Sequence, residues 1–121
     1  MIDLRQAKLK QWQDLNFPRE RYQAMDKEEL IDMILLLQFA LGMSEEVGEV
    51  SHAILKGCQR IREGQGGIDK DLVIDGVTDT LVFGVQALSQ LGVEDAEAGI
   101  SKTIDEVLQR DWLANPGGLA K

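Results

Sequence analysis

The fold is decided by LIDMILLLQFALGMSEEVGE, residues 30–49, where a nearly unbroken apolar run leads directly into a cluster of carboxylates. Between residues 30 and 41 apolar side chains point in almost every direction around a helix, which is typical of a helix buried on all sides. The rest of the chain can hardly cover every face of such a helix. We therefore expect a dimer or a higher assembly. The alternative is a single chain in which three other helices wrap the long one.

Helix signals on both sides of this stretch predict an all-α protein with four helices and no strand. Pro18 disfavours helix in the residue before it, so the first helix ends there. Asp26 is a suitable N-cap for the long helix, with Glu29 three residues on, as in a capping box. Asp69 caps the third helix and Gly92 is a natural stop for it. The expected helices cover residues 2–15, 27–57, 69–91 and 94–112.

The length of 121 residues predicts one domain, 1–121, with its motifs in a core region, 41–112, and an irregular tail, 113–121. The net charge of -8 argues against a protein that coats nucleic acid, because such proteins need a basic surface. A nucleotide substrate remains compatible with this charge, because a metal can bridge an acidic protein and an acidic ligand.

Cysteine content and apolar runs bear on location. The single cysteine, Cys58, precludes an intrachain disulfide and fits a reducing cytosol. The N-terminal segment is amphipathic with mixed charge, unlike a signal peptide. The longest apolar run, residues 34–37, is too short to span a bilayer. The sequence thus predicts a cytoplasmic protein without a membrane partner.

Carboxylates gather on one side of the long helix. At 100° per residue, Glu45, Glu46 and Glu49 fall within an arc of about 100°. The opposite side, expected to face the core, carries Met43, Val47, Val50 and Ile54. On the third helix, Asp75 and Asp79 are i,i+4 neighbours. If the two helices pack antiparallel, these five carboxylates converge.

Such a cluster needs compensation, because like charges at i,i+4 destabilise a helix. Ligands that are all oxygen favour Mg²⁺ or Mn²⁺ over zinc. Glycine is costly inside a helix, so Gly48 and Gly76 beside the carboxylates suggest room for a close neighbour or a ligand. The alternative is a solvated acidic face without a metal. Glu49-x-x-His52 also has the form of a di-iron element, but that site needs two such elements and the chain has one histidine.

The paired acidic motifs resemble the MazG-like all-α nucleoside triphosphate pyrophosphohydrolases. Glu45-Glu46-x-x-Glu49 matches the first family motif in full. In the second, Gly76 stands where a common family form has Glu, and Asp75 looks like its substitute. The resemblance continues through His52-Ala53-x-x-Lys56, the turn at 91–93 and Val107-Leu108-x-Arg110-Asp111-Trp112, and it covers roughly residues 41–112.

The resemblance implies a four-helix bundle assembled as a dimer or a dimer of dimers. It implies hydrolysis of a (d)NTP between the α and β phosphates, giving the monophosphate and pyrophosphate. Such a reaction is consistent with nucleotide-pool house-cleaning. By position, Glu45 would be the general base, and Mg²⁺ would be held by Glu46, Glu49 and Asp79, with Asp75 a fourth ligand. Mn²⁺ could replace Mg²⁺.

Basic residues near the motifs are candidates for contact with the phosphates. Lys56 shares the carboxylate stripe and is the first of them; the others are Arg60, Lys102 and Arg110. The glycine-rich segment 60–70 could be a flap over the phosphates, but it contains no P-loop motif. Two other functions remain open at this stage. One is a non-catalytic acidic interaction module, and the other is phosphoribosyl-ATP pyrophosphohydrolase activity on the same scaffold.

Overall fold

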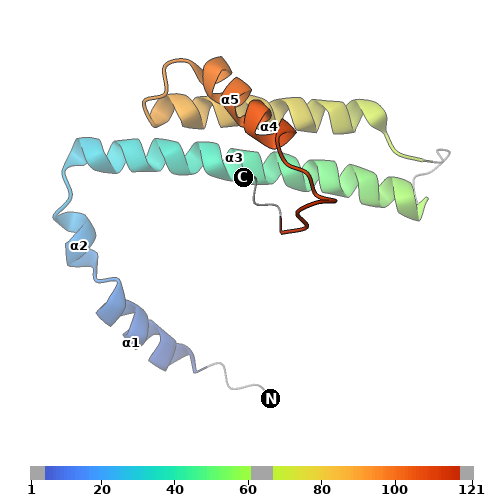
Figure 1. Ribbon diagram of the computed structural model, residues 1–121. Helices are drawn as coiled ribbons and strands as arrows, with labels where there is room; N and C mark the ends of the chain where they lie inside the picture. Colours follow the sequence, from blue (N-terminus) through green and yellow to red (C-terminus); the bar gives the residue numbers. More distant parts are fainter. Residues whose placement is uncertain (1–4, 61–66, 118–121) are drawn as a thin grey trace. The chain divides into compact units, whose positions relative to one another are not determined.

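The computed structural model describes residues 5–60 and 67–117, and every regular element in them is helical (Figure 1). This confirms the all-α prediction. The elements are α1 (Gln6–Asn16), α2 (Arg19–Gln23), α3 (Lys27–Gln59), α4 (Lys70–Gln90) and α5 (Ala96–Leu108). The chain divides into two compact units, Met1–Leu35 and Leu36–Lys121. Their boundary lies inside α3, and the single domain stays a prediction.

The first unit contains one element that was not predicted. The short helix α2 lies in what the sequence indicated was a polar connection. Pro18 precedes it with an extended backbone, and proline is well suited to the start of a helix because it lacks the N–H that would go unbonded there. On α1, Trp12 and Phe17 stack edge to face with their ring centroids 5.7 Å apart. The start of α1 predicted at residue 2 lies outside the described residues.

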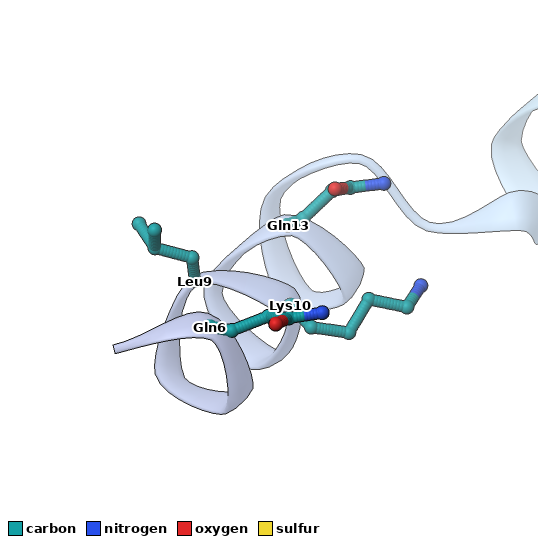
Figure 2. A pocket seen from close by; sticks show the side chains of 4 residues that line it. All are labelled: Gln6, Leu9, Lys10 and Gln13. Atoms are coloured by element: carbon teal, nitrogen blue, oxygen red, sulfur yellow. The ribbon is translucent and has the colours of Figure 1, made fainter. Parts of the chain in front are cut away.

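A hollow on α1 is lined by Gln6, Leu9, Lys10 and Gln13 (Figure 2). The four side chains spread outward from a single helix and do not converge on a common point. Lys10 Nζ already lies 2.6 Å from Asp14 Oδ1, one turn further along the helix. The side chains around this hollow therefore do not form a site that could carry out a reaction.

Both ends of α4 follow the predicted capping residues, whereas the residue that caps α5 was not predicted. The Asp69 side chain accepts a hydrogen bond from the Leu72 N–H and begins α4. After α4, Gly92 has φ 88°, a left-handed conformation that glycine adopts without strain. Asp95 accepts from the Ala98 N–H and begins α5. The fourth predicted helix, 94–112, was thus too long at both ends, because Asp95 caps α5 at residue 96 and the helix stops at Leu108.

The second half of α3 and α4 lie side by side and run antiparallel (Figure 1). Glycines set their separation. A Cβ at Gly76 would lie 2.6 Å from Val50 Cγ2, and a Cβ at Gly42 would lie 2.6 Å from the Phe83 ring. At the far end of α3, a Cβ at Gly57 would meet the Ile68 backbone at 2.7 Å. The two helices approach closely because these positions lack a side chain.

The seam, where α3 contacts α4, uses only part of the face of α3 that the helical wheel predicted to point to the core. Met43 and Val50 are half-buried as expected, but Val47 is 51% exposed and Ile54 is 38% exposed. The prediction for these two residues was wrong because the seam is built on small residues. Ala53 is the one buried hydrophobic side chain in the described part of the chain, beside buried glycines.

One helix in the described residues, α4, is long and apolar enough to cross a membrane by length and composition alone, with a mean hydropathy of 1.3. Core helices of soluble proteins pass the same test. The helix also carries Asp71, Asp75 and Asp79. Because ionisable groups are costly in the hydrocarbon core of a bilayer, the length and hydropathy of α4 are weak evidence for a membrane helix.

Candidate metal site on the α3–α4 seam

Glu46 lies on the seam itself. Its side chain is half-buried, between the positions where Gly42 and Val50 contact α4. The Glu46 backbone carbonyl lies 3.5 Å from where a Cβ on Gly76 would be, so the two helices are in close contact at this level. Asp79 follows Gly76 by three residues, on the same side of α4. The antiparallel register therefore places Asp79 beside Glu46.

The carboxylates around Glu46 act on its ionisation. Burial raises the pKa of Glu46 most, and Glu49 adds to this both by its charge and by accepting a hydrogen bond from the protonated Glu46 carboxyl. The charges of Asp79 and Glu45 raise the pKa of Glu46 further. Three of the other four predicted carboxylates thus act on Glu46.

One carboxylate oxygen of Glu46, Oε2, is buried without a hydrogen-bond partner in the part of the chain that the structure describes. A buried acceptor without a partner costs free energy, and more so when it carries charge. In the described part of the chain, no lysine or arginine forms an ion pair with this cluster. Its charge is therefore not compensated by the described side chains.

Asp75 stands apart from this group. It is exposed, and it is not among the residues whose charge raises the pKa of Glu46. Asp79, one turn further along α4, is half-buried and does act on Glu46. The substitution of Asp75 for the family glutamate therefore stays a prediction, with less support than the other ligands have.

A hollow of about 420 Å³ opens beside the carboxylates. Glu45 and Glu49 line it from α3, together with Gly48. A Cβ at Gly48 would contact no other part of the described chain within 4 Å. His52 also lines it. The sequence analysis named this residue in the Glu49-x-x-His52 element and in the family motif, but not among the candidate site residues. Leu72 completes the wall from α4. The position of Leu72 at this hollow could not be predicted from the sequence, because it depends on how α4 is placed against α3.

The predicted phosphate-binding cations do not line this hollow. Lys56 is half-buried on α3, and its Nζ lies 3.5 Å from Gln59 Oε1. Arg60 follows the end of α3 with φ 54°. Lys102 and Arg110 are exposed, on α5 and just after it. Most of the predicted flap, residues 61–66, lies outside the described residues. The phosphate-binding roles stay predictions.

The donor set fits a hard divalent cation, since it consists of carboxylate oxygens and includes an unpartnered buried one. Within residues 5–60 and 67–117, however, no group of three or more His, Cys, Asp or Glu side chains is close enough to hold a metal ion as it stands. Binding therefore requires side-chain rotation at Glu45, Glu46 or Glu49. The backbone positions of these residues are already fixed by the seam.

The raised pKa of Glu46 predicts a stability effect in the metal-free protein. The folded state binds the Glu46 proton more tightly than the unfolded state, so this group lowers stability as the pH rises above its unfolded pKa. Glu46→Gln should raise the Tm at pH 7, and this gain should shrink to zero as the pH falls below the ordinary pKa range of a glutamate carboxyl. Thermal melts in EDTA across this pH range measure the difference.

The exposed α5 variant Glu106→Gln serves as the control for this measurement, because it removes the same charge away from the cluster. It should leave the Tm nearly unchanged at both pH values. A Glu46→Gln protein that melts below the wild type at pH 7 would contradict the assignment of Glu46 as an uncompensated carboxylate.

Compared with known protein families, curated proteins and solved structures, the chain gives no match.

Proposed function

We propose that the protein is a metal-dependent nucleoside triphosphate pyrophosphohydrolase that cleaves a (d)NTP between the α and β phosphates. The observation that carries the proposal is the buried, unpartnered Glu46 Oε2 among carboxylates that raise the pKa of its own group. Such an arrangement is unfavourable without a cation, and a polyphosphate substrate needs a metal to approach it. The resemblance of the two acidic motifs to MazG-like enzymes supplies the reaction.

In this proposal Glu46, Glu49 and Asp79 hold Mg²⁺ or Mn²⁺, with Asp75 as a further candidate. The metal supplies charge stabilisation at the phosphate oxygens. Glu45 is exposed at the hollow and acts on the Glu46 carboxyl, so it is close to the proposed ligands without being buried among them. This position suits a general base that orients and deprotonates the attacking water.

The remaining proposals concern the substrate and the assembly. The hollow beside Glu45 and Glu49 would receive the phosphates, with Lys56 as the first candidate cation and Arg60, Lys102 and Arg110 as further ones. We expect the protein to act in the cytoplasm as a homo-oligomer, a dimer or a tetramer built from four-helix bundles. A nucleotide-pool house-cleaning role is consistent with this reaction.

Magnesium should stabilise the folded protein if the proposal is correct. Saturation at 100 times the dissociation constant corresponds to about 2.7 kcal/mol, which would raise the Tm by several degrees. The effect should be absent in the double variant Glu46→Gln/Asp79→Asn. Thermal melts with Mg²⁺, Mn²⁺ or EDTA measure this. A screen of (d)NTPs for pyrophosphate release then identifies the substrate.

An acidic interaction module gives the opposite result in this experiment. Mg²⁺ should change the Tm of such a module no more than it changes the Tm of the double variant. The module should also hydrolyse no nucleotide. Release of pyrophosphate from phosphoribosyl-ATP but from no (d)NTP would instead identify the related activity on the same scaffold.

A further inference from the structure

His52 lines the hollow beside the carboxylates without a partner in the described part of the chain. The residue is exposed, and its imidazole forms neither a hydrogen bond nor an ion pair with any described residue. The other residues that line the hollow are Glu45, Gly48, Glu49, Ala53 and Leu72. Ionised carboxylates only accept hydrogen bonds, whereas an imidazole carries an N–H donor in either protonation state. Among the described side chains that line the hollow, His52 is therefore the one that can donate to a bound anion.

Acceptor side chains give way to donor side chains along this face of α3. Residues at intervals of four, three and four positions lie on one side of a helix, and this spacing connects Glu45, Glu49, His52 and Lys56. The rise along the helix axis from Glu49 to His52 is about 4.5 Å. A polyphosphate held through a metal at the carboxylates would therefore meet His52 as the next side chain along this face.

Gly48 leaves the space between Glu45 and His52 open. It precedes His52 by four residues on the same face of α3, and a Cβ at Gly48 would contact no other part of the described chain within 4 Å. Gly76 differs, because Val50 occupies the space where its Cβ would be. A ligand held at the carboxylates can therefore reach the imidazole without meeting a side chain at residue 48.

We propose that the imidazole of His52 donates a hydrogen bond to the pyrophosphate that leaves. In the proposed hydrolysis, the oxygen of a water molecule bonds to the α-phosphorus, and a proton of that water passes to Glu45. The bond from the α-phosphorus to the bridging oxygen breaks, and this oxygen leaves with the pyrophosphate and keeps the electron pair. Negative charge therefore increases on the pyrophosphate, so a hydrogen-bond donor stabilises the transition state more than the bound substrate.

The arrangement of donors favours the pyrophosphate over the nucleoside as the partner of His52. Lys56 follows His52 by four residues on the same face, so two donor side chains succeed the carboxylates. The pyrophosphate carries several negative charges, whereas the nucleoside carries none. The inference rests on the proposed function, because that reaction releases pyrophosphate. Binding of pyrophosphate can nevertheless be measured without hydrolysis.

Isothermal titration calorimetry with inorganic pyrophosphate and Mg²⁺ tests this contact. His52→Ala should weaken pyrophosphate binding by about tenfold or more, as expected for a hydrogen bond to a charged group. His52→Gln keeps an N–H donor and should recover part of the affinity. Ser51→Ala is the matched control, because it removes an exposed donor at the neighbouring position, outside the hollow. This control should bind pyrophosphate as the wild type does.

The (d)NMP product and the metal separate this contact from other roles of His52. His52→Ala should bind (d)NMP as the wild type does, and Mg²⁺ should raise the Tm of both proteins equally. Selective loss of (d)NMP affinity would place the nucleoside at His52, and a lost Mg²⁺ effect would make the imidazole a metal ligand. Either result overturns the proposal.

The pyrophosphate titration itself can also overturn the proposal. It does so if the wild type binds no pyrophosphate with Mg²⁺, if His52→Ala binds it as tightly as the wild type, or if His52→Gln binds it no better than His52→Ala. Pyrophosphate binding that depends on His52, in a protein that hydrolyses no (d)NTP, would support the contact and refute the proposed function.

Discussion

Glu49→Gln and Asp79→Asn are each expected to lower magnesium-dependent pyrophosphate release by roughly 100-fold or more. Each change keeps the shape of the side chain and removes one of the charges that act on Glu46. A metal ligand contributes several kcal/mol of charge stabilisation, and each 1.36 kcal/mol is a factor of about ten in rate. Initial rates with saturating Mg²⁺ and the best (d)NTP measure the loss.

The folded state should survive both substitutions, because each relieves repulsion within the carboxylate cluster. The Tm in EDTA should equal or exceed that of the wild type, which separates lost chemistry from lost folding. Glu106→Gln and Asp105→Asn remove the same charges from exposed positions on α5 and should keep full activity. Full activity of Glu49→Gln or Asp79→Asn would show that the site has been placed on the wrong residues.

Gly76→Ala is expected to destabilise the protein by about 1–3 kcal/mol, although alanine is the better helix former. The new methyl group would lie 2.6 Å from Val50 Cγ2. Valine has one strongly preferred rotamer in a helix, so it cannot turn aside. The helices α3 and α4 must separate, which also moves Asp79 away from Glu46. Urea unfolding at a fixed protein concentration measures the loss of stability.

Two further variants test whether the contact of the new methyl group with Val50 causes the loss of stability. Val50→Ala in the Gly76→Ala background removes the clashing Cγ2 atom and should recover part of the lost stability. Gly99→Ala on α5 adds a methyl group where nothing lies within 4 Å, and should stabilise by up to about 1 kcal/mol. A Gly76→Ala protein as stable as Gly99→Ala would contradict the close approach of the two helices.

The start of α3 and both ends of α4 were predicted well, because capping is local. Asp26, Asp69 and Gly92 act on backbone groups within a few residues of themselves, and each was recognised from its neighbours. The short helix α2 was missed because a single turn has too few residues to show a periodic pattern. The end of α5 was missed because its apolar and polar spacing continues beyond Leu108.

The face of α3 that meets α4 was predicted less well. This helix is apolar on more than one side, so hydrophobic periodicity could not tell the face that meets α4 from the other apolar faces of α3. Of the predicted core-facing residues, Met43 and Val50 are half-buried but Val47 and Ile54 are exposed. The closest approaches on α3 are instead at Gly42 and Gly57. Close packing against glycine depends on which residue of the other helix lies opposite, and spacing within one helix does not contain that information.

The sequence by itself determined that the chain is helical and that two helices carry spaced carboxylates, because both properties depend on residues within a few turns of one another. Only the tertiary structure decided how these carboxylates differ. It placed Glu46 on the seam with one buried, unpartnered oxygen, set Asp79 beside it, and left Asp75 exposed. The register of α3 against α4 makes this distinction, and that register depends on contacts such as Gly76 with Val50 between segments far apart in the sequence.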